Sequence, residues 1–111
     1  MQLLPNHIDA QVDIAKLRDY CLSNDHPRGR HKARQFASSL NISANDAEWL
    51  REVILRGLSY TEAISQDNDE FGKRWRMDML LTRQNRRVMV RTIWMIRHAE
   101  NFPRFITCWV L

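Results

Sequence analysis

The chain has 111 residues, of which 44% are hydrophobic, 27% charged and 9% aromatic. This length fits one compact domain of ordinary size, so we expect a single domain over residues 1–111. Three glycines and three prolines exclude a collagen-like or low-complexity chain, and four tryptophans argue against disorder. The net charge is +4, from 17 basic and 13 acidic residues. Composition therefore indicates a folded basic domain and says nothing about catalysis.

The chain shows no segment typical of export or membrane insertion. Residues 1–7 lack the basic and apolar regions of a secretory signal, and no apolar run approaches the ~18–20 residues that a bilayer requires. Cys21 and Cys108 stand in apolar surroundings far apart in the sequence, which suits buried free thiols in a reducing compartment. We therefore expect a cytoplasmic protein with no membrane partner.

Apolar residues recur at helical spacing in the first half of the chain and predict three helices. The apolar stripes are Ala10, Ile14, Leu17 and Cys21, then Ala33, Phe36, Ala37 and Leu40, then Leu50, Val53 and Ile54. The first two predicted helices cover residues 13–23 and 30–41. Ser43 and Asp46 resemble a capping box at the start of the third helix, and we expect Gly57 to end it as a left-handed cap.

The apolar period changes from 3.6 to 2 in the second half of the chain. Residues 58–72 are polar and acidic, with a short helical turn expected at residues 61–65. Beyond them, alternation predicts three strands, over residues 74–81, 88–96 and 105–110. A turn at residues 83–86 joins the first two. We therefore expect an α+β fold, with about three N-terminal helices packed on a small C-terminal antiparallel sheet of three or four strands.

The basic residues are segregated along the chain. A first cluster, without an acid, consists of Arg28, Arg30, Lys32 and Arg34. A second cluster contains a single acid, Asp78, and seven basic residues, namely Lys73, Arg74, Arg76, Arg83, Arg86, Arg87 and Arg91. Residues 43–70 carry seven acids against two arginines, so we expect one basic and one acidic face.

A basic face is the usual footprint of a polyanion, and nucleic acid is the first candidate. The residues expected to contact it, besides those of the candidate catalytic site below, are Arg28, Arg34, Arg74, Arg76 and Arg87. The alternative interpretation is a solvated surface that keeps the protein soluble.

The segment His26–Ala33 carries the first candidate site, because it opens the second helix. A helix N-terminus presents unpaired N–H groups and partial positive charge, which favour an anion such as phosphate. Arg30 and Lys32 flank the apolar stripe on opposite sides and can reach the rim of a cleft, while His31 projects away from it. His26 lies in the preceding loop, free to point at the bound group. The alternative is a basic turn followed by a solvated helix.

Arg91 is the second candidate, since a guanidinium in an apolar strand is rarely buried without a partner. It must pair with a carboxylate such as Asp78, face water or await an anion. Thr92 would share a site with Arg91 only if the strand bulges, because neighbouring residues of a regular strand point to opposite faces. Trp94 is expected in the core rather than as a base-stacking platform.

Four segments give the chain a resemblance to known domains, namely Leu4–Asn6, His26–Ala33, Val90–Trp94 and Pro103–Thr107. With the motif His-Pro-x-Gly-Arg-x-Lys-Ala, the chain resembles a family of small uncharacterised bacterial domains. That family occurs as stand-alone chains and at the C-terminal ends of larger toxin-like and phage-associated proteins. The resemblance implies a toxin-like effector domain. The order of helices before sheet also resembles, as a fold, the barnase/EndoU/colicin/RelE group of metal-independent ribonucleases.

These observations lead to the hypothesis of a toxin-type endoribonuclease that needs no metal or other cofactor, since the histidines lack further ligands at a familiar spacing. His26 would act as acid or base, and Arg30 and Lys32 would hold the phosphate. Arg91 would stabilise the charge of the transition state from the sheet, with Thr92 as a hydrogen-bond partner. The alternative is a non-catalytic module whose basic face binds nucleic acid or an acidic protein. The expected partners are RNA and a small acidic antitoxin or immunity protein.

Overall fold

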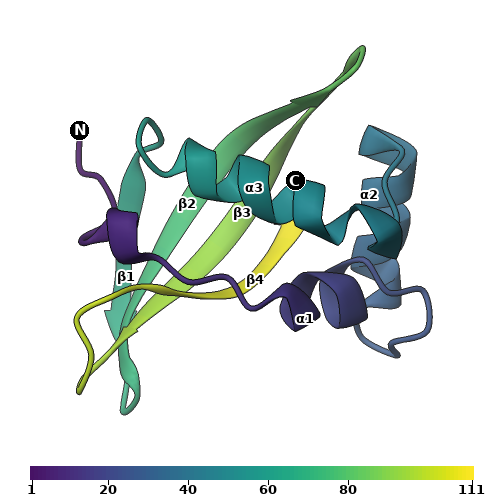
Figure 1. Ribbon diagram of the computed structural model, residues 1–111. Helices are drawn as coiled ribbons and strands as arrows, with labels where there is room; N and C mark the ends of the chain where they lie inside the picture. The colour runs from purple at the N-terminus through teal and green to yellow at the C-terminus, as the bar shows by residue number, and fades with distance from the viewer.

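Four antiparallel strands form the scaffold of the protein, whose computed structural model describes residues 1–111 (Figure 1). The strands are β1 (Ala63–Asn68), β2 (Gly72–Arg83), β3 (Arg86–Arg97) and β4 (Arg104–Val110), and they lie side by side in chain order. β2 and β3 pair along all twelve of their residues, and Gln84 takes a left-handed conformation in the turn between them. The expected α+β class, the antiparallel sheet and its hairpin are confirmed.

The β2–β3 hairpin has one buried face and one face that carries arginines. Its core face is at most 5% exposed and consists of Met77, Met79, Leu81, Val90, Thr92 and Trp94. The opposite side, called here the outer face, carries Arg74, Arg76, Asp78, Leu80, Met89, Arg91 and Ile93. Successive side chains of a strand point to opposite sides, so the period of two in the sequence sets this division.

The helices lie against the core face of the sheet (Figure 1). Helix α1 (Ile14–Lys16) continues as a π-helical turn (Leu17–Cys21), and α2 (Arg30–Leu40) follows it. After a 3-10 turn, α3 (Ala47–Gly57) crosses the sheet, whereas α2 packs against β3 and β4 beside the sheet edge. None of these helices is long and apolar enough to cross a bilayer.

One apolar core connects helices and sheet, and its fully buried members include Phe36, Leu50 and Trp94. The ends of the helices follow local chemistry. Asn41 takes the left-handed conformation that closes α2, and Ser43 and Asp46 form the expected capping box. The three predicted helical segments are therefore present, close to their predicted bounds.

Two local predictions are wrong. Gly57 is the last residue of α3 and not a left-handed cap, and its small size serves packing instead, since a Cβ there would stand 3.0 Å from Met79 Sδ. The helical turn expected at residues 61–65 is the start of β1. Only Ala63 of this strand is buried, so β1 has no apolar pattern that would reveal it. The strand is defined by its backbone pairing with β2, which begins with Ala63 opposite Met77.

Gly29 fixes the start of α2 against the π-helical turn. A Cβ on Gly29 would overlap the carbonyl group of Tyr20, so the two segments approach as closely as bare backbone allows. Lys32 follows three residues later on α2, and its side chain contacts the same tyrosine. The glycine therefore sets the position of Lys32 relative to Tyr20.

We expect Gly29→Ala to destabilise the protein by about 1–3 kcal/mol, the usual cost of forcing extra volume into a packed region. Gly57→Ala is the matched control, because the flexible end of the Met79 side chain can move away from the new methyl group. Chemical denaturation of both variants measures the difference. Equal losses of stability in the two variants would contradict the close approach at Gly29.

Candidate functional site

Lys32 occupies the junction of the π-helical turn, α2 and β4. Its Nζ donates hydrogen bonds to Tyr20 Oη at 3.2 Å and to Thr107 Oγ1 at 2.9 Å. The ammonium also lies over two rings, 4.8 Å from the centroid of Tyr20 and 5.2 Å from that of Trp109. No carboxylate lies within 4.0 Å of it. Hydroxyl groups and rings therefore hold this cation, and no acid neutralises it.

Two buried cysteines lie behind Lys32. Because an ammonium only donates, Thr107 Oγ1 accepts from Lys32 and has its own proton free for Cys21 Sγ, 3.6 Å away. A hydrogen bond from Cys108 lowers the pKa of Cys21 to about 6 against the opposing effect of burial, with smaller contributions from Thr107 and the Lys32 charge. Burial raises the pKa of Cys108 well above its usual value. Both thiols are fully buried, so they support the site and do not line it.

A groove of about 440 Å³ opens beside Lys32, between α2 and β4. Its lining, which defines the α2–β4 groove, consists of His31, Lys32, Gln35, Trp109 and Val110. It contains an imidazole, an ammonium and an indole, and no acid. Such a set can contact a phosphate, stack against a nucleobase and exchange a proton.

His26 lies next to this site but is committed to the backbone. Its Nδ1 accepts hydrogen bonds from the backbone N–H groups of Arg28 and Gly29, both at 3.0 Å. This geometry assigns the lone pair to Nδ1 and the ring proton to Nε2 in the neutral imidazole. The ring meets Tyr20 edge-on at 4.7 Å. His26 therefore shapes the turn before α2, and proton abstraction by its Nε2 would require both backbone bonds to break.

Arg91 pairs with Asp78 on the outer face, one of the outcomes that the sequence allows. Arg91 Nε is 2.9 Å from Asp78 Oδ1, and Arg91 Nη2 is 3.1 Å from Asp78 Oδ2. Arg76 Nε approaches the same carboxylate at 3.9 Å. Arg91 stands directly opposite Trp109 in the pairing of β3 with β4. Because Trp109 lines the α2–β4 groove, Arg91 lies on the strand next to it.

Thr92 belongs to the core and lies outside the site. It is fully buried, and its Oγ1 donates to the carbonyl oxygen of Met77 at 2.9 Å and accepts from Trp94 Nε1 at 2.8 Å. The irregularity of β3 falls between Ile93 and Trp94, in its pairing with β4. The bulge that Thr92 would need to join Arg91 is therefore absent, and Trp94 is a core residue as expected.

The other basic residues fall into two groups. Around the start of α2, Arg28, Arg30 and Arg34 are exposed and form no salt bridge, which leaves positive charge near the α2–β4 groove. On the sheet, Arg74 pairs with Asp69 at 2.8 Å, whereas Arg87 is exposed and unpaired. No group of three or more His, Cys, Asp or Glu side chains converges in the chain, so no residues are assigned to a metal ion.

Sequence reasoning missed five residues of the site, namely Tyr20, His31, Gln35, Thr107 and Trp109. His31 was expected to project away, yet it lines the α2–β4 groove with Gln35, one helical turn later. Helical spacing places these two on one face of α2, a signal that the sequence does contain. Nothing local to the other three indicates their contacts, because those contacts depend on how β4 meets α2.

The fold and this groove define a small α+β domain with a basic, aromatic-lined cleft at its sheet edge. Within that class, the chain belongs to a family described as a domain of unknown function (DUF6883), whose model matches residues 3–111. No curated protein and no solved structure matches the chain.

The Arg91–Asp78 pair predicts a pH dependence of stability. The hydrogen bond from Arg91 lowers the pKa of Asp78, so the pair stabilises the fold above the unfolded value of about 3.9 and this contribution is lost as the pH falls through the lower folded value. We expect Asp78→Asn to be less stable than the wild type at pH 7, with a gap that closes below about pH 4.

Thermal unfolding between pH 7 and pH 2 measures this gap. Asp25→Asn, at an exposed position without an ion pair, is the control. A gap for Asp78→Asn that stays constant down to pH 2 would show that Arg91 does not stabilise the carboxylate.

Proposed function

We propose that the protein is a toxin-type, metal-independent endoribonuclease that acts in the cytoplasm and cleaves RNA in the α2–β4 groove. The observation that carries this proposal is the Lys32 ammonium, which no carboxylate neutralises. Two of its three N–H groups bind Tyr20 and Thr107, which leaves one for an incoming ligand. A cation held in place at an open groove is suited to the charge of a phosphodiester.

The proposed reaction is an internal transesterification. The 2′-oxygen of RNA loses its proton and attacks the adjacent phosphorus, and the bond to the 5′-oxygen of the next nucleotide breaks. The products are a 2′,3′-cyclic phosphate and a 5′-hydroxyl end, and the 5′-oxygen takes up a proton. Lys32 would stabilise the added negative charge on the non-bridging oxygens, which is greatest in the transition state.

The proposed proton-transfer group is His31 in place of His26. His31 lines the groove beside Lys32, and neither of its ring nitrogens has a hydrogen-bond partner within the chain. We therefore assign proton transfer to His31, because Nδ1 of His26 is occupied. Trp109 supplies the face on which a nucleobase can stack, while Arg28 and Arg30 extend the positive field along the backbone of the RNA.

We also propose that a small acidic antitoxin or immunity protein covers the outer face. Leu80 and Met89 are paired in register there, and they are 48% and 39% exposed. On the same face, Arg87 lies two residues before Met89, and Arg76 lies four residues before Leu80. The Asp78–Arg91 pair stands between Arg76 and Leu80, so the surroundings of this apolar patch carry a net positive charge. An acidic surface with an apolar centre would complement this patch, and charge complementarity would speed its association.

The test of cleavage is a set of three variants assayed on single-stranded RNA in EDTA. We expect Lys32→Met to reduce the cleavage rate by about 10²–10³ and His31→Ala by about 10²–10⁴, the usual contributions of a charge-stabilising group and of an acid or base. Lys73→Met is the matched control, because Lys73 also lies over an indole ring, 5.9 Å from the Trp75 centroid. It pairs with Ile96, five residues along β3 from Arg91, which stands opposite Trp109 of the groove.

Each variant must first unfold at a temperature close to that of the wild type. Cleavage that survives EDTA, leaves cyclic phosphate ends and depends on Lys32 and His31 but not on Lys73 supports the proposal. Salt-sensitive binding of RNA without any product would overturn it in favour of a non-catalytic binding module.

The partner is tested in cells by co-expression with the product of a gene adjacent to this one. We expect an acidic product to restore growth, and we expect Met89→Glu and Arg87→Glu to abolish that protection through repulsion between like charges. Arg18→Glu, an exposed change in the π-helical turn, is the control. Protection that withstands both outer-face changes would place the partner elsewhere on the molecule.

A further inference from the structure

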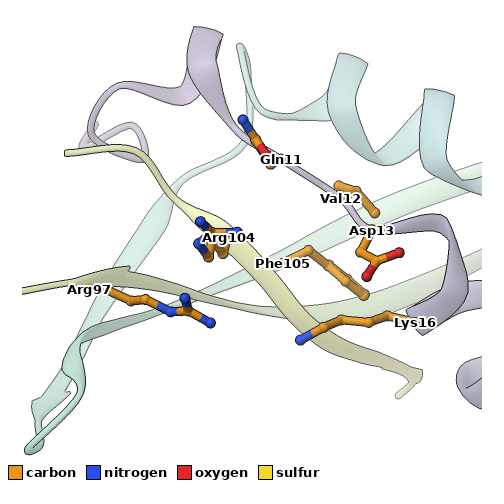
Figure 2. Close-up of a pocket in the computed structure, with 7 residues that line it drawn as sticks. All are labelled: Gln11, Val12, Asp13, Lys16, Arg97, Arg104 and Phe105. Atoms are coloured by element: carbon orange, nitrogen blue, oxygen red, sulfur yellow. The ribbon is translucent and has the colours of Figure 1, made fainter. Parts of the chain in front are cut away.

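A second pocket, of about 420 Å³, lies at the opposite end of β4 from Trp109 (Figure 2). One wall comes from the segment around α1. The other comes from the last residue of β3 and the first residues of β4. The charged side chains that line it are Asp13, Lys16, Arg97 and Arg104. With Glu100, which pairs with Arg104 beside the lining, three cations meet two carboxylates in a concave site that the proposed cleavage reaction does not use.

Lys16 has no ion pair in this pocket, and Arg97 has only a long one. The two side chains extend toward one another from opposite walls (Figure 2). Lys16 has no carboxylate within 4.0 Å, and Arg97 Nε has only a distant one, Glu100 at 3.9 Å. Asp13 lies nearby, but its Oδ1 accepts a hydrogen bond from the backbone N–H of Ala15 at 3.0 Å. Like charges that face each other across a cavity favour an anion between them.

Arg104 supports the pocket in a different way. Its Nε and Nη2 donate to Glu100 at 2.8 and 2.6 Å, and its guanidinium lies 4.8 Å from the Phe102 ring centroid. The Glu100 carboxylate is therefore already bound in a two-point pair with Arg104 and is not free to neutralise Arg97. Arg104 fixes the acid, and Arg97 keeps most of its hydrogen-bonding capacity.

The walls of the pocket are held by backbone hydrogen bonds. Gln11 N–H donates to the carbonyl oxygen of Pro103 at 3.0 Å, and Phe105 N–H donates to that of Gln11 at 2.9 Å. This short parallel pairing ties the chain before α1 to the start of β4. The backbone positions of the two walls are therefore set before any ligand arrives, so binding has to order only the side chains of Lys16 and Arg97.

We propose that this pocket binds a phosphate group through Lys16 and Arg97. A phosphate offers several acceptor oxygens, which suit one planar guanidinium and one ammonium on opposite sides. The source of the phosphate is either a free mononucleotide or the backbone of an RNA chain. The inference stands on this pocket alone and does not depend on cleavage in the α2–β4 groove.

The experiment is a titration of the Lys32→Met protein, in which the groove is disabled, with inorganic phosphate followed by NMR. We expect the Arg97 Nε–Hε resonance and the backbone amide of Lys16 to shift in a saturable manner. Arg97→Gln and Lys16→Gln should each weaken binding by about tenfold or more, since each removes a charged hydrogen-bond donor to the phosphate. Arg56→Gln is the control and should bind as the parent does, because Arg56 lies beside Leu80 at the other end of the β2–β3 hairpin.

Two further titrations, with adenosine monophosphate and with an RNA oligomer, distinguish the sources. If the mononucleotide binds more tightly than the oligomer, the source of the phosphate is a free nucleotide. If the oligomer binds more tightly, the source is the RNA backbone. Arg97→Lys, which retains the charge, should keep part of the affinity and shows that the loss in Arg97→Gln is not unfolding. No shift at Arg97 with any of the three ligands, or equal affinity in parent and Arg97→Gln, would overturn the proposal.

Discussion

The hydrogen bonds of Lys32 join two consecutive helical segments to the last strand of the chain. Through Tyr20 and Thr107 they connect the π-helical turn, α2 and β4 around one ammonium group. Gly29 makes this possible, because only a residue without a Cβ lets α2 start against the Tyr20 carbonyl. The α2–β4 groove exists because these segments meet there. The same contact therefore shapes the edge of the fold and places an unneutralised cation at an opening.

The positions of the acids determine which basic residues are held in ion pairs and which are free to bind a ligand. On the outer face Asp78 engages Arg91, and at the end of the sheet Glu100 engages Arg104. Exposed or half-exposed pairs of this kind add little net stability, but they fix side-chain positions. The cations without close acids lie elsewhere, with Lys32 at the groove and Lys16 at the second pocket. Net charge alone would not reveal this division, since paired and unpaired residues count equally in it.

Patterns within one element and the pairing of neighbouring strands were predictable, whereas contacts between helices and sheet were not. The alternation of β2 and β3 and the capping box at Ser43 follow from local periodicity and hydrogen bonding, so the sequence identified them correctly. β1 has no apolar pattern and depends on β2 for its backbone hydrogen bonds, which local reasoning misses. For the site, Lys32 was identified from its place on a helix. Its partner Thr107, 75 residues away, required the packing of β4 against α2.

The central claim is that Lys32 holds the phosphate that RNA cleavage acts on. A crystal structure with an RNA oligomer carrying 2′-deoxyribose at the cleaved position tests it most directly, because the missing hydroxyl prevents the reaction. We expect a phosphate oxygen within about 3 Å of Lys32 Nζ, with a neighbouring base against the Trp109 ring. A backbone that instead follows the arginines of the outer face and leaves Lys32 without contact would contradict it.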